Sequence, residues 1–472
     1  MYKGAQCPYT LTYTLYLLMR VRFAPSPTGF LHLGGLRTAL FNFLIARKHP
    51  EGRFILRIED TDRSRIVETA VEGLQRTLQW AGINYDEGPD KPAKYGPYIQ
   101  SQRLPFYQEH SREIIENGRA YRCFCSKERL ELIKGISGAG RYDGNCRMIP
   151  KKESEARANN NEPFVLRFKA PDDIAAVPVI DLVFGPLKSN TIDDVILMKS
   201  DGYPTYHFAN IIDDHLMKID LVMRGAEWIP STPLHGLLYD AFGWKAPKFA
   251  HLPLLINPDG SKLSKRQDSA HVSHYISSGF LPEALINFVA FLGWNPKSER
   301  EIFGLDELIK EFDLKGLNQS DATVNLDKLK WLNRQHLKSQ AMSNDKLIKD
   351  LEGLVMNKFN LTCSEDYLKQ VIKLSAERIF FLQDVIDLCP YFFIDPDYTA
   401  DLSDLHTNKL VNDHLTSLLR MKSYTEITSM PLLRLIMTGC RVGPSIQETV
   451  KILGDETCRR RFEKFKSCLE NK

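Results

Sequence analysis

Two groups of residues far apart in the chain have the composition of phosphate-binding sites. In the first group, His32 is followed by Gly34 and Gly35 where a strand-like stretch gives way to a helix-like one. A helix N-terminus binds anions through its free N–H groups, glycines let a ligand approach the backbone, and a histidine ring can donate to a phosphate oxygen. Taken alone, this group fits a phosphate site and a tight turn with a solvated histidine equally well.

The second group is a short basic stretch. Lys262 and Lys265 stand three residues apart, Arg266 follows, and Gly260 and Ser261 precede them. This composition predicts a mobile cationic loop, which can neutralise charge that develops on a leaving pyrophosphate. One such stretch on its own is more simply a solvated basic turn, so its meaning depends on the segments that accompany it.

The elements that would position the first group begin a strand–loop–helix unit. Residues 20–23 alternate arginine with apolar residues and predict a short strand. Residues 24–29 contain two prolines and a glycine and predict a loop. From Leu33 to Leu44, apolar residues recur at helical spacing.

A second strand is expected over residues 53–58, and it ends at the acid Glu59. A helix with apolar residues from Val67 to Leu78 follows, and Gly82 is its expected stop. This is the beginning of a βαβ unit, and ligands of open α/β sheets bind beyond the carboxyl ends of the strands. Glu59 is therefore a candidate ligand contact, with a helix-capping acid as the alternative.

Five segments, met in one order along the chain, carry a resemblance to a known family: residues 22–35, 57–62, 199–210, 224–228 and 260–266. The first and last resemble the two ATP-binding motifs of class I aminoacyl-tRNA synthetases. The wording Pro-Ser-Pro-Thr-Gly within the first resembles the glutamyl-tRNA synthetases. One departure is Gly35, where many class I enzymes have a second histidine.

The resemblance runs from about residue 20 to the C-terminus and implies an α/β fold with a helical second half. It divides the chain into a split Rossmann-like catalytic domain (20–95 and 200–260), a tRNA acceptor-binding insertion (96–199), a stem-contact region (261–330) and an all-α anticodon-binding region (331–472).

The same resemblance implies ATP-dependent ligation of L-glutamate to tRNA-Glu through a glutamyl-adenylate. The implied glutamate pocket comprises Arg22, Ala24, Ser26, Glu59, Tyr206, Asn210 and Arg224. The implied ATP contacts, with Mg²⁺ bridging the phosphates, are His32, Gly34, Glu227, Leu255, Lys262, Leu263, Ser264, Lys265 and Arg266, of which His32, Lys262 and Lys265 would be catalytic. Arginines suit the carboxylates of a dicarboxylic amino acid, and Glu59 suits its ammonium. A structural ion pair is the alternative for Arg224.

Three cysteines fall within the expected insertion: Cys123, Cys125 and Cys146. Some bacterial members of the family carry a similar cluster that binds zinc with a histidine two residues past the third cysteine. Met148 occupies that place here, and structural zinc wants four protein ligands. Zinc is therefore doubtful and no metal ligand is assigned, although Tyr142 or another side chain remains open as a fourth ligand.

Length and composition limit the number of domains and the class of protein. A chain of 472 residues predicts three or four domains, and 43% hydrophobic content is typical of a globular protein. The net charge of +3 permits a nucleic-acid partner without predicting one. No apolar run reaches the roughly 18 residues that span a bilayer, and nine scattered cysteines favour a reducing compartment. The expected partners are tRNA, L-glutamate and ATP, without a membrane, and the resemblance favours a monomer.

Residues 1–19 lack acidic residues and are either a targeting segment or a stretch before a start at Met19. The wording of the two motifs resembles the mitochondrial branch of the family, so the mitochondrial matrix is expected, with the cytoplasm as the alternative. Whether tRNA-Gln is also charged stays open.

The sequence has three rival functions to exclude. A synthetase-like protein that glutamylates a tRNA base lacks the helical half, a glutaminyl enzyme carries a β-barrel there, and a catalytically dead paralogue would have lost one of His32, Glu59, Lys262 or Lys265. All four residues are present.

Overall fold

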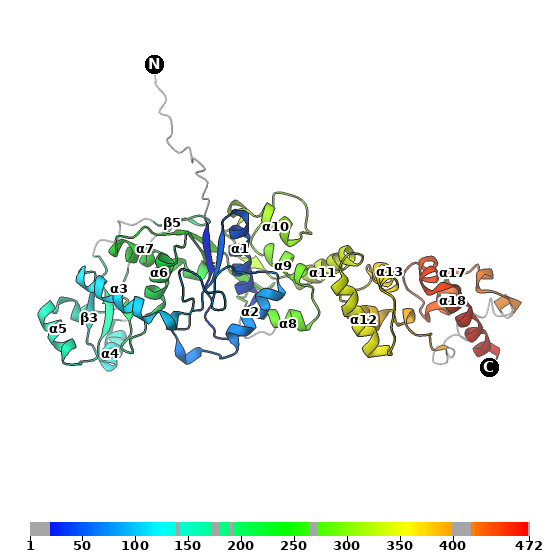
Figure 1. Cartoon of the computed structure of the whole chain (residues 1–472), viewed down its shortest axis with the longest axis horizontal. Coiled ribbons are helices and arrows are strands. Elements are labelled where there is room, and N and C mark those ends of the chain that lie inside the picture. Colours follow the sequence, from blue (N-terminus) through cyan, green and yellow to red (C-terminus); the bar gives the residue numbers. More distant parts are fainter. Residues whose placement is uncertain are drawn as a thin grey trace, which may run out of the picture. The chain divides into compact units, whose positions relative to one another are not determined.

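The computed structural model describes residues 19–137, 142–171, 179–187, 192–263, 271–398, 417–418 and 420–470. The chain divides into two compact units. Unit 1 comprises Met1–His274 and Ile286–Asn325, and unit 2 comprises Tyr275–Leu285 and Leu326–Lys472 (Figure 1). Within the described ranges, no helix combines the length and the apolar character needed to span a membrane. The expected targeting segment, apart from Met19, and the predicted ATP contacts Ser264, Lys265 and Arg266 lie outside the described residues.

A six-stranded sheet forms the centre of unit 1. Its order is β2 (Arg53–Leu56), β1 (Arg20–Phe23), β8 (Leu221–Gly225), β9 (Lys248–Leu252), β5 (Val179–Asp181) and β6 (Gly185–Leu187). All neighbouring strands pair in parallel except β5 and β6, which are antiparallel. The predicted α/β class with a parallel sheet is therefore confirmed. The strand expected over residues 20–23 is also confirmed, and the strand expected over residues 53–58 is present but ends at Leu56.

Helices cover both faces of this sheet, with α1 (Leu33–Lys48) on one side and α6 (Tyr206–Leu216) and α7 (Thr232–Ala241) on the other (Figure 1). Val21 and Phe23 of β1 are buried, as alternation predicts, but Arg20 and Arg22 are buried as well. Both arginines are bonded to the α6 side of the sheet: Arg20 Nε donates to the carbonyl of Met217 and Arg22 Nε to Asp214. The strand is buried on both faces because ion pairs and hydrogen bonds compensate its charged face.

A smaller antiparallel sheet in unit 1 has the order β3 (Ala120–Cys123), β4 (Val165–Phe168) and β7 (Ile196–Met198). The range 96–199, predicted as one insertion, contains this sheet but is not uniform. Its strands β5 and β6 belong to the six-stranded sheet, because β5 pairs with β9 at Asp181 and Phe249. No helical or strand pattern in the sequence signals a pairing between segments so far apart.

The helix expected from Val67 begins later. Helix α2 (Ala70–Trp80) starts three residues on, and Val67 is 43% exposed outside it. Gly82, with φ of +72°, follows its end as predicted. The other elements of the first 325 residues are η1 (Arg63–Arg65), η2 (Gln100–Arg103), α3 (Leu104–Glu116), α4 (Lys127–Ser137), η3 (Asn145–Met148), α5 (Lys151–Asn159), η4 (Ala226–Ser231), β10 (Leu255–Ile256), α8 (Val272–Ser277), α9 (Pro282–Ala290), α10 (Leu305–Glu311), η6 (Leu314–Gly316) and β11 (Ala322–Thr323).

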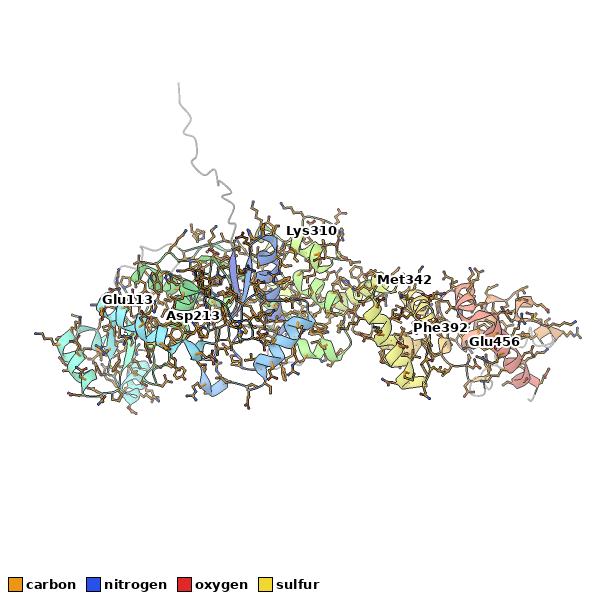
Figure 2. The ribbon with its side chains drawn as sticks, in the orientation of Figure 1. Glu113, Asp213, Lys310, Met342, Phe392 and Glu456 are labelled. Atoms are coloured by element: carbon orange, nitrogen blue, oxygen red, sulfur yellow. The ribbon has the colours of Figure 1, made fainter. Side chains whose placement is uncertain are left out.

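Unit 2 is helical throughout its described part, as predicted. Its elements are α11 (Leu326–Gln340), α12 (Asp345–Phe359), α13 (Glu365–Ser375), α14 (Gln383–Leu388), η7 (Pro390–Phe392), η8 (Tyr424–Glu426), α17 (Met430–Thr438) and α18 (Ile446–Glu470), which breaks at Gly454 with φ of 78°. Buried leucine, isoleucine and phenylalanine side chains form one core. Phe392 belongs to this core, whereas Met342 and Glu456 are exposed (Figure 2).

Candidate functional site

The first motif leads from the carboxyl end of β1 into the N-terminus of α1. His32 is the N-cap residue, and its Nδ1 accepts a hydrogen bond of 3.0 Å from the N–H of Gly35. In the neutral ring the proton is therefore on Nε2. A side chain on Gly35 would place its Cβ 2.7 Å from Leu31 Cδ1, so any larger residue there would require the Leu31 side chain to shift. The first turn of α1 contains no acidic residue, so this end of the helix keeps the positive character that binds anions.

The second motif begins on a hairpin that lies against the first. Strand β10 is followed by a turn at residues 257–260, where Gly260 has φ of +81°. After the turn, the N–H of Leu263 donates to the carbonyl of Leu255 at 3.1 Å. The exposed Lys262 follows this turn and bridges to Ile256. A Cβ built on Gly34 would lie 3.8 Å from Leu255 Cδ1, so the predicted ATP contacts Gly34 and Leu255 are neighbours.

The residues on both sides of positions 264–270 are held near the first motif. Leu263 is bonded to Leu255, as described above. His271 forms an isolated bridge with His32, and the N–H of Val272 donates to the carbonyl of Leu31 at 2.8 Å. Residues about 240 positions apart in the sequence thus meet at one place.

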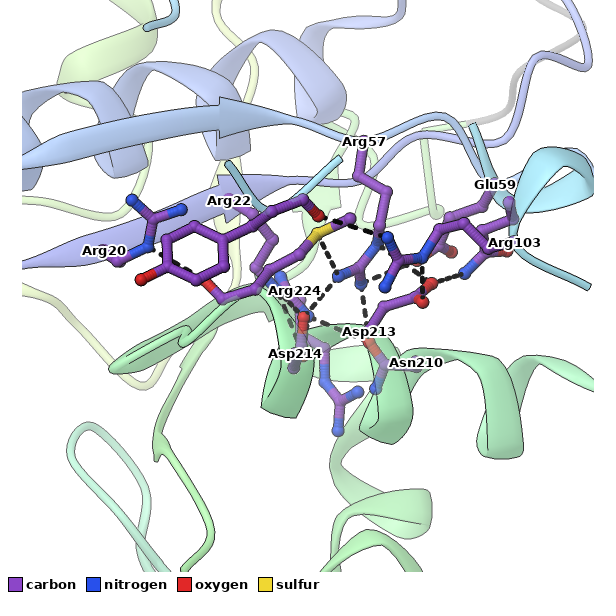
Figure 3. Close-up of polar contacts among 12 residues, drawn as sticks. Arg20, Arg22, Arg57, Glu59, Arg103, Asn210, Asp213, Asp214 and Arg224 are labelled. Carbon is purple, nitrogen blue, oxygen red and sulfur yellow. Dashed lines mark hydrogen bonds and ion pairs between the residues drawn. The ribbon is translucent and has the colours of Figure 1, made fainter. Parts of the chain in front are cut away.

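A buried cluster of arginines and carboxylates lies between β1, β2 and α6 (Figure 3). Arg57 Nη1 donates to Asp214 at 2.6 Å and its Nη2 donates to Glu59 at 3.1 Å. Arg22 Nε donates to Asp214 at 3.1 Å. Both arginines also donate to the side-chain oxygen of Asn210 at 3.2 Å. The predicted pocket residues Arg22, Glu59 and Asn210 are therefore brought together.

Asp213, next to Asp214 on α6, anchors a second part of this cluster. It accepts hydrogen bonds from Arg103 Nε at 2.6 Å, Gln100 Nε2 at 2.8 Å and the Tyr107 hydroxyl at 2.8 Å. All these side chains are buried. Three arginines, 22, 57 and 103, thus face three carboxylates, and the charges of the cluster compensate one another within the protein.

Burial and neighbouring charge act in opposite directions on the carboxylates of this cluster. Burial raises the pKa of Glu59, and the attraction of Arg57 and Arg22 only partly offsets that rise. Burial also opposes ionisation of Asp214, but Arg22 and Arg57 outweigh it and lower the pKa of this carboxyl. Asp214 is therefore the fixed anion of the cluster, whereas Glu59 ionises more readily when another cation approaches.

Arg224, at the end of β8, differs from these arginines because its contacts are neutral. Its Nε donates to His251 Nε2 at 3.1 Å, Nη1 to the Tyr206 hydroxyl at 3.1 Å, and Nη2 to Thr232 Oγ1 at 2.9 Å and His235 Nδ1 at 3.1 Å. The residue is 5% exposed, and among the described residues no carboxylate forms an ion pair with it. The alternative of a structural ion pair therefore finds no partner in the described chain.

The remaining predicted contacts occupy the rim of these groups. The Tyr206 ring lies on the Trp228 ring with centroids 4.0 Å apart. Glu227 is exposed, and its carboxylate lies so close to Gly225 that a Cβ there would be 2.1 Å from it. Ala24 is half-buried and Ser26 exposed in the loop after β1.

Several residues of this region were not predicted as site residues from the sequence: Arg57, Gln100, Arg103, Tyr107, Asp181, Asp213, Asp214, His235 and His251. The doublet Asp213-Asp214 inside the otherwise apolar stretch of α6 was a signal, because unpaired acids are rarely placed in a buried helix face. The pairing of Asp181 with His251 had none, since the two residues are 70 positions apart.

Three cysteines converge on Tyr142: Cys123 at the end of β3, Cys125 just after it, and Cys146 in η3. Their sulfurs lie within 4.8 Å of one another, and Cys125 and Cys146 are 3.5 Å apart. The Tyr142 hydroxyl is 3.3 Å from Cys123 Sγ and 3.5 Å from Cys125 Sγ. Met148, by contrast, is 83% exposed. Sulfurs bound to one zinc at about 2.3 Å lie roughly 3.8 Å apart, so three thiols and a phenol here have the spacing of a four-ligand set.

Comparison with known proteins gives consistent matches. The family model described as "tRNA synthetases class I (E and Q), catalytic domain" matches residues 18–331. A glutamate–tRNA ligase from Chlorobium phaeobacteroides is 41% identical, over 94% of this chain and 97% of the relative. One from Chlorobium chlorochromatii is 42% identical, over 96% of this chain and 98% of the relative. A crystal structure of a glutamate tRNA ligase from Elizabethkingia meningosepticum in complex with its amino acid superposes with a TM-score of 0.83 at 37% identity, covering 96% of this chain and 99% of that one.

Proposed function

The chain belongs to the family of class I tRNA synthetases for glutamate and glutamine, and from this membership we propose that it ligates L-glutamate to tRNA-Glu with the cleavage of ATP to AMP and pyrophosphate. The observation that carries the choice of glutamate is Arg224, a buried cation whose four contacts are all neutral. An anion is the ligand that such a group is built to receive.

The reaction has two steps. An oxygen of the glutamate α-carboxylate attacks the α-phosphorus of ATP, the bond to the bridging oxygen breaks, and pyrophosphate leaves. A ribose hydroxyl of the terminal tRNA nucleotide then attacks the carbonyl carbon of the adenylate, and AMP leaves as the ester forms. No bond to the protein is needed, so the chain contributes position and charge.

In this proposal the amino acid lies among two cations and one anion. Arg224 binds the side-chain carboxylate, and Arg22, whose Nε and Nη2 are engaged by Asp214 and Asn210, contributes its positive field. Glu59 binds the α-ammonium. This cation would lower the pKa of Glu59, which burial has raised. Tyr206, Asn210, Ala24 and Ser26 complete the pocket. A glutamine amide would leave Arg224 without its counter-charge, which disfavours glutamine.

ATP would be bound by the two motifs. His32, Gly34 and the N-terminus of α1 face the phosphates, with Leu255 and Glu227 near the nucleoside. The second motif would contact the phosphates from the other side with Lys262, Leu263, Ser264, Lys265 and Arg266. Its two lysines and its arginine supply the positive charge. Mg²⁺ fits this arrangement as an ion held by the phosphate oxygens and water, and when bound it neutralises phosphate charge.

ATP–pyrophosphate exchange tests the proposal, with glutamate or glutamine as the amino acid and with or without tRNA. Exchange that depends on glutamate, together with esterification of tRNA-Glu, is expected. Exchange with glutamine alone would favour a glutaminyl enzyme, and no exchange would favour a catalytically dead paralogue. Parallel assays with tRNA-Gln decide whether that tRNA is a second substrate.

We propose further that Cys123, Cys125, Cys146 and Tyr142 hold a structural zinc ion. The spacing of the three sulfurs and the phenol supports this, although Met148 replaces the usual histidine. When bound, the metal would tie β3 to η3. Elemental analysis of wild type and Cys146→Ser tests the assignment, and zinc absent from wild type purified without chelator would contradict it.

Localisation in the mitochondrial matrix and a monomeric state are also proposals. The first is supported by the wording of the two motifs alone, and the relatives above are bacterial. Imaging of the full chain fused at its C-terminus to a fluorescent protein, with and without residues 1–18, tests it. Light scattering tests the second.

A further inference from the structure

Arg224 is surrounded by side chains that each have to present a lone pair to it. We propose that two of them, His251 and His235, are positioning residues that fix the Arg224 guanidinium for the glutamate side-chain carboxylate. Asp181 sets the tautomer of His251, and His207 accepts the proton of His235. The inference rests on the proposed function of Arg224 as the carboxylate-binding residue. It assigns the residues that make this arginine selective.

The first arm runs from Asp181 to Arg224 through His251. Asp181 Oδ2 is 2.7 Å from His251 Nδ1, and both side chains are fully buried. Since an ionised carboxylate only accepts, Nδ1 carries the proton, and Nε2 of the neutral ring accepts from Arg224 Nε. Asp181 is itself fixed, because its Oδ1 accepts from the N–H groups of Val183 and Phe184 at 2.9 Å.

Geometry and electrostatics agree that the His251 ring is neutral. Its contact with Asp181 has the distance of an ion pair, yet a doubly protonated ring would direct its Nε2–H at the Nε–H of Arg224. Burial lowers the pKa of His251 and the charge of Arg224 lowers it further, and together they outweigh the attraction of Asp181.

The second arm runs from His207 to Arg224 through His235. Arg224 Nη2 and His235 Nδ1 are 3.1 Å apart, and a guanidinium has no lone pair to offer, so Nδ1 accepts. The proton of His235 is therefore on Nε2, from which it is donated to His207 Nδ1 at 3.1 Å. Burial and the charge of Arg224 hold the pKa of His235 well below its ordinary value.

The hydrogen bonds of Arg224 show what neutral acceptors achieve at this position. A guanidinium has five N–H groups, and His251, His235, Thr232 and Tyr206 take four of them. The Thr232 hydroxyl donates to the carbonyl of Trp228 at 2.9 Å, so it too accepts from Arg224. The side chain is thereby fixed while its charge stays uncancelled, and one N–H of Nη1 is left for a substrate. A carboxylate in place of either histidine would fix the arginine equally well but would neutralise it, as Asp214 does for Arg22.

Asp181→Asn tests the inference with almost no change of shape. If the amide oxygen keeps the backbone hydrogen bonds of Val183 and Phe184, its NH₂ faces His251 Nδ1 and forces the proton onto Nε2, against Arg224. We expect the KM for glutamate to rise roughly ten-fold or more, with the preference for glutamate over glutamine reduced. The KM for ATP and the melting temperature should stay near those of the wild type.

Two substitutions of His251 form a matched pair. His251→Gln can still accept from Arg224 and donate to Asp181, so it should retain most of the affinity for glutamate. His251→Leu can do neither and should resemble Asp181→Asn. Asp86→Asn, which removes a carboxylate that holds Arg47 on another part of unit 1, is the control for lost charge.

The outcomes separate the inference from the proposed function. If Arg224→Gln raises the KM for glutamate but Asp181→Asn and His251→Leu leave both that constant and the amino-acid preference unchanged, the histidines do not position the arginine. If Asp181→Asn and His251→Leu raise the KM for glutamate and the KM for ATP alike and lower the melting temperature, the role of Asp181 and His251 is structural. The inference is then wrong. If Arg224→Gln itself leaves glutamate binding unchanged, the assignment of Arg224 fails and the inference falls with it.

Discussion

At the scale of single residues, the buried arginines of unit 1 have two different kinds of environment. Arg22 and Arg57 face carboxylates, whereas Arg224 faces two histidines and two hydroxyls. We expect Arg224→Gln to lower kcat/KM for glutamate by an amount corresponding to about 2–5 kcal/mol, because a desolvated carboxylate would lose its charge partner. For glutamine the loss in kcat/KM should be smaller, so the preference for glutamate over glutamine becomes smaller. Arg47→Gln, which affects a partly exposed pair with Asp86, is the control. An equal loss for both amino acids would refute the specificity role.

Lys265 carries a prediction that depends on sequence alone, since it lies outside the described residues. We expect Lys265→Ala to slow glutamate-dependent pyrophosphate exchange by an amount corresponding to about 2.7–4 kcal/mol, as for loss of one donor to a developing charge. The KM for ATP should change far less, because the interaction forms mainly in the transition state. The exposed Lys310→Ala is the control (Figure 2). Exchange at the wild-type rate would remove Lys265 from the catalytic residues.

At the scale of elements, α6 ties β1 and β2 together through Asp214. Asp214→Asn should leave Arg22 and Arg57 undercompensated and destabilise the fold by about 3–5 kcal/mol at neutral pH, as for a broken buried pair. Because the folded-state pKa of Asp214 is lowered, its contribution is present above its unfolded pKa, about 4, and is lost as the pH falls toward the lower folded value. Urea unfolding at pH 7 and below pH 4 measures the free energy of unfolding of both proteins. The difference between wild type and variant should be smaller in acid. A gap independent of pH would mean that shape, not charge, matters at this position.

Local patterns predicted the elements that carry the two motifs. Alternation identified β1, and helical spacing identified α1, because each signal lies within a few neighbouring residues. The start of α2 was placed too early, since Val67 is apolar and in phase but stands outside the helix. The Arg224 site depends instead on partners brought from distant segments, such as Asp181 through His251, and no local pattern reports such pairs. The cysteine cluster was visible in the sequence, with Tyr142 as an open fourth ligand, but the convergence of these side chains was not.

At the scale of the whole molecule, positive and negative residues nearly balance. The net charge of +3 on 472 residues gives little general attraction for a polyanion, so tRNA binding has to rest on local cationic groups near the surface. In the proposed pocket, by contrast, glutamate would meet buried cations. Exposed charges are screened over about 8–10 Å at physiological salt, and buried pairs much less.

The two substrates should therefore respond differently to salt. Between 50 and 200 mM KCl we expect the KM for tRNA to rise roughly ten-fold, the value for about two phosphate contacts, while the KM for glutamate in pyrophosphate exchange changes less than about two-fold. Arg224 is 5% exposed, and this burial is the reason for the second expectation. Substituting potassium glutamate for KCl is unsuitable because glutamate is a substrate, so potassium acetate serves as the second salt and separates ionic strength from chloride binding. Parallel increases in both constants would mean that the amino acid reaches a solvent-exposed cation and that Arg224 does not bind its carboxylate.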